Sequence, residues 1–208
     1  ERQFYYAEIP LHLGNVNTCL LGYFQSWKYF DHCKAQIFEL LALEKKQQTV
    51  REKLLSQWVN LDYSISMHFR MGDYKNLQNH HPIMPVAYYR KALTELLLLT
   101  GKHDWTCMVV CEDEDIDYVQ EKINILKEEF PNIQFQRLEG HLEDWEQMLA
   151  MSLCAHHIIG NSSFSWFGAY FNPNPDKFVY YPSMWFGPAQ GNKDLRDLCP
   201  PDWIKINL

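Results

Sequence analysis

Two short segments of this chain gather side chains that can hold a strongly charged ligand. The first, Ile65–Tyr74 (ISMHFRMGDY), begins as an alternating, β-prone run and ends in His68, Arg70, Gly72 and Asp73. Arginine suits a diphosphate because its planar fork donates paired hydrogen bonds and keeps its charge. The segment therefore predicts a diphosphate contact at Arg70. An ordinary strand end with a solvated Arg–Asp pair is the alternative.

The second segment, His156–Asn172 (HHIIGNSSFSWFGAYFN), joins a short apolar run to an aromatic-rich helical stretch. Amide and hydroxyl groups stand at the junction, on Asn161, Ser162 and Ser163. A helix N-terminus carries unpaired N–H groups and a partial positive charge, so the junction is a natural anion site. The alternative is that Ser162 or Ser163 merely caps the helix. Because the first segment also predicts a diphosphate contact, we favour the anion site.

The elements that must position these segments alternate between strands and helices. Extended, apolar runs predict strands over Tyr63–Phe69, Trp105–Cys111, Ile133–Leu138, His156–Gly160 and Phe178–Tyr181. Helical spacing predicts helices over Tyr23–Leu43, Val86–Leu99, Ile116–Phe130, His141–Cys154 and Phe164–Phe171. This alternation predicts an α/β fold with a doubly wound, Rossmann-like parallel sheet. In such sheets ligands bind beyond the carboxyl ends of the strands, where both segments lie.

The composition argues against several classes of function. The chain has 208 residues and a formal net charge of −7, whereas general nucleic-acid binding needs a basic face. No run approaches the roughly 18 apolar residues of a membrane helix. The six cysteines show no CxxC spacing, which argues against zinc. The sequence shows no secretory signal, so we expect a cytoplasmic protein.

Both segments resemble motifs of the inverting α-1,2-fucosyltransferase family. HFRMGDY is similar to the family's His-x-Arg-Arg-Gly-Asp motif, and NSSFSWFGA to its Asn-Ser-Ser-Phe-Ser-Trp-Trp-Gly-Ala motif. GYFQSWKYF (Gly22–Phe30) resembles a family segment before the first motif, and MSLCAHHII (Met151–Ile159) one that leads into the last. The resemblance implies a GDP-fucose donor, a glycan acceptor, no required metal or other cofactor, and a two-lobed GT-B architecture.

The chain also departs from the family pattern at several positions. Met71 replaces the second arginine, which removes a positive charge, and Phe167 replaces the second tryptophan. Gly160 stands where alanine is common, and Gln147 where an acidic residue is often found, with Glu146 beside it. The family's Ser-Asp-Asp sequence after a central strand is Cys111–Asp113 here.

The resemblance also bears on domain organisation. We expect residues 59–208 to form the nucleotide-sugar-binding domain, the donor lobe of a GT-B type enzyme. Residues 1–58 are expected to form a helical segment, a remnant of or linker to the acceptor lobe. The Gly-rich segment with which the family opens is not found, so we expect a short or truncated N-terminal lobe that another domain or chain completes.

Sugar transfer assigns expected roles to the motif residues. The leaving diphosphate needs fixed donors, and Arg70 is the first candidate. The second is the junction, whose side chains and amides belong to Asn161, Ser162, Ser163, Phe164 and Ser165. Asp113 is a candidate contact to the nucleotide. Asp73 is the candidate general base, with His68 as its alternative. A non-catalytic nucleotide- or carbohydrate-binding module, or a transferase using another GDP-sugar, remains an alternative function.

Overall fold

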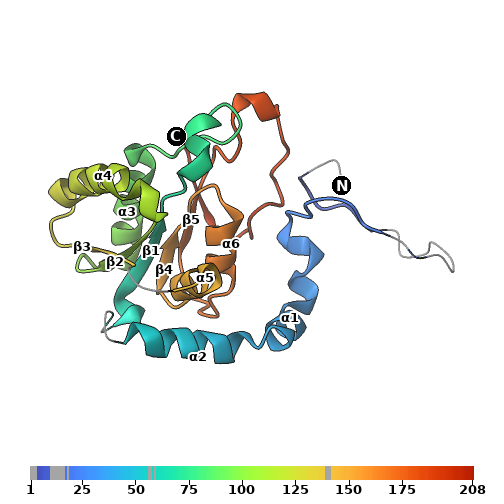
Figure 1. Ribbon diagram of the computed structural model, residues 1–208, viewed down its shortest axis with the longest axis horizontal. Coiled ribbons are helices and arrows are strands. Elements are labelled where there is room, and N and C mark those ends of the chain that lie inside the picture. Colours follow the sequence, from blue (N-terminus) through green and yellow to red (C-terminus); the bar gives the residue numbers. More distant parts are fainter. Residues whose placement is uncertain (1–3, 10–16, 18, 56–57, 59, 139–141) are drawn as a thin grey trace.

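A six-stranded, all-parallel sheet forms the centre of the computed structural model, which describes residues 4–9, 17, 19–55, 58, 60–138 and 142–208 (Figure 1). The strands are β1 (Ser64–His68), β2 (Thr106–Val110), β3 (Gln134–Arg137), β4 (His156–Ile158), β5 (Val179–Pro182) and β6 (Ile204–Ile206). Their order is β3-β2-β1-β4-β5-β6, and every neighbouring pair is parallel. The predicted doubly wound α/β fold is confirmed.

Helices cover both faces of this sheet. They are α1 (Lys34–Leu40), α2 (Leu43–Leu54), α3 (Val86–Thr100), α4 (Ile116–Glu129), α5 (Asp144–Ser152) and α6 (Ser163–Tyr170). One core cluster joins the sheet to α3 and α4, and a second joins it to α2, α5 and α6. The two clusters give the three-layer arrangement of Figure 1. No helix among the described residues is long and apolar enough to cross a membrane.

The continuous helix predicted over Tyr23–Leu43 is wrong. Two 3-10 turns, Trp27–Tyr29 and Asp31–Cys33, precede α1, and Ala42 has a left-handed φ of 48° that separates α1 from α2. The reason lies in tertiary packing, because the ring of Phe30 contacts α6 from between the two turns. Such contacts override the weak preference expressed by helical spacing.

Two further boundaries differ from expectation. The strand β6 was not predicted, because three residues show too little alternation to reveal a strand. The helix expected to begin at His141 begins at Asp144, because Glu143 has an extended backbone and is its N-cap; His141 itself lies outside the described residues. At this start Glu143 and Glu146 form a capping box, in which each side chain accepts a backbone N–H of the other.

Candidate active site

The strand β1 brings His68 and Arg70 to one side of the sheet, because side chains alternate along a strand. Ile65 packs in the cluster with α3 and α4. Ser66 points to the opposite face, where its hydroxyl lies 2.7 Å from His157 Nδ1. His68 and Arg70 follow Ser66 at intervals of two residues and line the same cavity. The predicted alternation therefore positions both side chains.

A cavity of about 730 Å³ lies at the carboxyl ends of β1, β2 and β4. The chain runs outward from β1 through β3 and returns to β4 on the other side of β1, so this is the topological switch point of the sheet. The lining residues are His68, Arg70, Tyr74, Val110, Cys111, Glu112, Asp113, Glu114, Asp144, Gln147, Ser162, Ser163 and Phe164. The volume lies within the range of about 300–1,000 Å³ typical of small-molecule sites.

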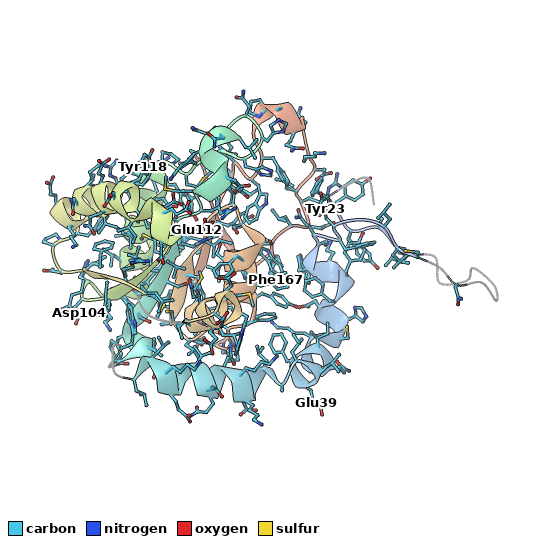
Figure 2. The ribbon with its side chains drawn as sticks, in the orientation of Figure 1. Tyr23, Glu39, Asp104, Glu112, Tyr118 and Phe167 are labelled. Atoms are coloured by element: carbon cyan, nitrogen blue, oxygen red, sulfur yellow. The ribbon has the colours of Figure 1, made fainter. Side chains whose placement is uncertain are left out.

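Arg70 is held by two carboxylates at the edge of this cavity. Its guanidinium donates to Glu112 Oε1 through Nη1 and to Asp73 Oδ1 through Nη2, the latter at 2.5 Å. The guanidinium carbon also lies 4.8 Å from the centre of the Tyr74 ring, a cation–π contact. Figure 2 labels Glu112, which comes from the segment after β2. The Arg70 guanidinium is thus held in position, and its charge is more than offset by two carboxylates, before any ligand enters.

A buried carboxylate fixes the turn that follows Arg70. Asp115 is fully buried, accepts the Gly72 N–H at 2.7 Å and pairs with Lys75 Nζ. Gly72 has a left-handed φ of 42°, and a Cβ there would lie 2.8 Å from Glu112 Oε1. Glycine therefore allows the turn and leaves room for the Glu112 carboxylate.

At the second motif, Ser162 is the N-cap of α6. Its Oγ accepts the Phe164 N–H at 3.3 Å, as the capping alternative anticipated. Ser163, the first residue of α6, is exposed, and no described residue accepts a hydrogen bond from its N–H. Phe164 lines the cavity, and its ring centre lies 5.4 Å from that of His68. Ser163 is thus the residue of this junction that presents a backbone donor outward.

The other two polar residues of the junction point inward. Asn161 is 2% exposed and donates from Nδ2 to the carbonyls of Pro82, at 3.0 Å, and Trp185, at 3.1 Å. Ser165 is fully buried and donates to the Ser162 carbonyl at 3.3 Å. Neither residue lines the cavity. Their hydrogen bonds hold the junction in place.

Burial keeps His68 neutral. It lowers the pKa of His68 to about 3, with a further lowering by the nearby charge of Arg70. His68 Nδ1 is buried and has no hydrogen-bond partner among the described residues. This nitrogen lies against Gly160, 3.4 Å from the position of a Cβ there, and not in the cavity. A neutral imidazole is also a weak base near pH 7.

Two of the departures from the family pattern acquire a structural meaning. Gln147 lines the cavity, whereas the neighbouring Glu146 is 3% exposed and pairs with Lys53 of α2 at 2.5 Å. Burial of Met71 in the core with α3 and α4 explains how a methionine is accommodated in place of the second arginine. The cavity therefore has an amide where the family often has a carboxylate.

Sequence reasoning missed three residues that shape the site. Tyr74 supports Arg70 and donates from its hydroxyl to the Asn161 carbonyl at 3.2 Å, which links the two motifs. Glu112 was noted only as a departure, and Asp115 was not singled out. The signal available was position, since Glu112 and Asp115 follow the predicted strand Trp105–Cys111 toward the ligand-binding edge.

Asp113 lines the cavity on the same segment, with its side chain 89% exposed and paired with Arg137. No group of three or more His, Cys, Asp or Glu side chains within the described parts of the chain is arranged to hold a metal ion. The charged lining residues are Arg70, Glu112, Asp113, Glu114 and Asp144. The cavity is therefore polar, with one cation among several carboxylates.

Fold and site together define a parallel α/β protein with a polar ligand cavity at the switch point of its sheet. Residues 6–207 match the model of glycosyl transferase family 11, and the chain belongs to that family.

Two bacterial relatives and one animal relative illustrate the range of this match. The O-antigen biosynthesis glycosyltransferase WbnK of Escherichia coli is 26% identical over 197 residues, which are 90% of this chain and 60% of the relative. An α-1,2-colitosyltransferase of the same organism is 27% identical over 186 residues, 89% of this chain and 61% of the relative. A galactoside 2-α-L-fucosyltransferase of Caenorhabditis elegans is 38% identical over 89 residues, 42% of this chain and 22% of the relative.

The chain spans about 60% of the length of the two bacterial relatives. Among solved structures, E. coli ADP-heptose LPS heptosyltransferase II aligns with a TM-score of 0.48 and 11% identity, over 79% of this chain and 44% of that one. A glycosyl transferase family 9 protein of Veillonella parvula aligns with a TM-score of 0.48 and 14% identity, over 79% and 40%.

Proposed function

We propose that this chain is the donor-binding lobe of an inverting, GT-B type α-1,2-fucosyltransferase, which transfers fucose from GDP-fucose to a glycan hydroxyl without a required metal. The observation that carries the proposal is the meeting of Arg70 and the exposed start of α6 at Ser163 on one cavity at the sheet's switch point. The names of the relatives, an α-1,2-colitosyltransferase and a galactoside 2-α-L-fucosyltransferase, support the linkage and the acceptor class.

The diphosphate of the donor takes the place of the carboxylates on Arg70 in this proposal. The Arg70 fork binds the β-phosphate, and the Ser163 N–H and hydroxyl donate from the positive end of α6. As the bond between the anomeric carbon and the β-phosphate oxygen breaks, its electron pair stays on GDP. These fixed donors stabilise that charge. Ser162 and Phe164 shape the wall beside them, and Asn161 and Ser165 hold the junction.

The acceptor hydroxyl forms the new bond to the anomeric carbon and gives its proton to Asp73. This carboxylate is 60% exposed, so once the diphosphate has taken its place on Arg70 it is accessible to an incoming hydroxyl. His68 is a weaker candidate because its pKa is about 3. We assign His68 a hydrogen bond to the donor from the part of its ring that borders the cavity.

The nucleotide lies toward the segment after β2 and the start of α5. Asp113 is placed to accept from the ribose or base, in the way that acidic residues at this edge of Rossmann-like sheets do. Gln147 contacts the same end of the cavity. A second domain or chain would complete the acceptor lobe.

A related candidate function is the transfer of another GDP-linked sugar. The colitosyltransferase matches 89% of this chain at 27% identity, so a relative of this sequence is named for a sugar other than fucose. The amide of Gln147, in place of a carboxylate, adds a reason to compare donors.

Calorimetric titration with GDP-fucose, GDP-mannose and GDP, in the absence of metal, tests the proposal. GDP-fucose is expected to bind, and Arg70→Ala is expected to abolish binding and lower donor turnover about 10²- to 10³-fold, as for other charge-stabilising donors. Arg90→Ala is the matched control, because Arg90 pairs with Glu129 on the outer surface.

Either of two results would contradict the proposal: full binding by Arg70→Ala, or no binding of any GDP compound by the unaltered chain. Hydrolysis of GDP-fucose without acceptor separates an enzyme from a binding module, because a binding module has no need to activate the anomeric carbon.

A further inference from the structure

A second cavity, of about 260 Å³, adjoins the candidate donor site at the start of α6. We call it the aromatic cavity; its lining residues are Tyr23, Phe24, Gln25, Ser26, Phe30, Ser163, Trp166, Phe167, Trp185 and Leu198. We propose that it binds one neutral sugar ring of the acceptor glycan. The inference rests on the proposed function and extends it to the position of the acceptor.

The two cavities share Ser163. Ser163, Trp166 and Phe167 stand three and four residues apart, so they form one face of α6. Phe164 is about a quarter-turn away and lines the donor cavity. Figure 2 shows Tyr23 and Phe167 to one side of α6 and Glu112 to the other. The N-terminal turn of α6 thus separates two ligand spaces that meet at one exposed serine.

The chemistry of the aromatic cavity suits a neutral ring. None of its lining residues is acidic or basic, whereas the donor cavity carries Arg70 and several carboxylates. Its volume falls below the roughly 300 Å³ at which drug-sized sites begin, which leaves room for one ring and not for a nucleotide. A neutral saccharide ring presents an apolar C–H face that packs on aromatic side chains.

The aromatic walls are held in fixed positions. Trp166 is 5% exposed and donates from Nε1 to the Leu198 carbonyl at 3.0 Å. The Phe30 ring meets the Trp166 ring edge to face at 6.0 Å. Asn161 of the second motif holds the backbone of Trp185. Walls ordered before binding lower the entropic cost of positioning a ligand.

One residue that lines the aromatic cavity, Gln25, has a polar atom without a hydrogen-bond partner among the described residues. The side-chain oxygen Oε1 of Gln25 is buried and makes no hydrogen bond to any described residue. An unsatisfied buried acceptor is costly, and sugar hydroxyls are donors of the kind it lacks. Gln25 lines the cavity, so a rotation of its side-chain amide on binding would bring this oxygen to a sugar hydroxyl and supply the orienting polar contact.

The position of the aromatic cavity also suits a direct transfer, because the attacking hydroxyl must reach the anomeric carbon of the bound donor. Ser163 lines both cavities, so an acceptor ring in the aromatic cavity would lie next to the donor.

Binding of a simple galactoside tests the inference. The chain saturated with GDP is titrated with lactose, and the indole N–H signals of Trp166 and Trp185 are followed by NMR after assignment with single Trp→Phe variants. Lactose is expected to shift both signals. Tyr23→Ala and Gln25→Ala are each expected to weaken lactose binding about five-fold, the effect of losing one ring contact or one hydrogen bond.

Tyr118→Ala is the matched control, since Tyr118 is an exposed tyrosine of α4 remote from α6 in Figure 2. It should leave the affinity for lactose unchanged. Lactose binding that is insensitive to Tyr23→Ala and Gln25→Ala, or no shift at Trp166 and Trp185, overturns the inference. GDP binding without lactose binding rejects the acceptor site alone, whereas lactose binding without GDP binding rejects the proposed donor site.

Discussion

At the scale of single residues, the proposed donor must compete with two carboxylates for the guanidinium of Arg70. Arg70 is paired with Glu112 and Asp73. In the proposed donor complex, a diphosphate would displace both carboxylates from the guanidinium. Glu112 is half-exposed, and pairs of this kind contribute about 0.2–1 kcal/mol. Removing the competing charge should therefore strengthen GDP binding modestly.

Glu112→Gln is expected to tighten GDP binding about two- to five-fold, the range that corresponds to such a pair. Calorimetric titration at low and high salt measures it, and added salt should reduce the difference between variant and parent. Glu114→Gln, which removes a charge from the same wall without a contact to Arg70, is the control. Weaker binding by Glu112→Gln would indicate that the carboxylate contacts the donor instead.

Asp73→Asn separates binding from catalysis at the other carboxylate. The amide cannot accept the acceptor proton, so turnover is expected to fall about 10²- to 10⁴-fold, the usual contribution of a general base. Donor affinity should not fall, because Arg70 loses a competing partner. Steady-state rates together with GDP titration measure both quantities. Full turnover by the variant would remove Asp73 from the mechanism.

At the scale of elements, the turn after β1 is the most constrained part of the site. Gly72 and Gly101 both have left-handed φ angles, but only Gly72 has a neighbour, Glu112, in the space a Cβ would fill. Gly101→Ala should lower the free energy of unfolding by about 1 kcal/mol, through backbone strain alone. Gly72→Ala should lower it further and weaken GDP binding, because Asp115 holds this turn through the Gly72 N–H.

Urea unfolding and GDP titration of the two variants measure these effects. Equal losses of stability, with GDP binding intact in both, would show that the Gly72 turn can relax without moving Arg70.

The same elements show which parts of the fold and site can be predicted from the sequence. The strand predicted over Tyr63–Phe69 correctly brought His68 and Arg70 to the ligand-binding edge, because His68 ends β1 and Arg70 lies two residues beyond it. The turns around Phe30 were missed, because their shape depends on contacts with α6 that no local pattern encodes. The pairing of Arg70 with Asp73 was anticipated, but its second partner, Glu112, was missed because it lies 42 residues away in sequence.

At the scale of the whole molecule, three buried histidines connect the fold to pH. His157 bridges the strands: Asn172 donates from Nδ2 to its Nε2 at 2.8 Å, so its Nδ1–H donates to the Ser66 hydroxyl. The Asn172 orientation is fixed because its Oδ1 accepts the Asn174 N–H at 2.8 Å. A doubly protonated His157 would lose the first of these bonds. The histidine pair in the apolar strand thus has a structural role.

Stability is therefore expected to fall in mild acid. Burial lowers the pKa of His68 to about 3, that of His156 to about 4, and that of His157 well below its usual value. In the unfolded chain the histidine pKa is near 6.5, so below that pH the unfolded chain binds protons that the folded chain does not bind. The free energy of unfolding therefore has its full value above about pH 6.5 and falls as the pH approaches the folded pKa values. Between about pH 6 and pH 5, His68 and His156 each contribute a slope that approaches about 1.4 kcal/mol per pH unit, and His157 adds a loss of the same sign. Urea unfolding across this interval measures the slope. A flat profile between pH 6.5 and 5 would mean that these histidines protonate within the folded chain.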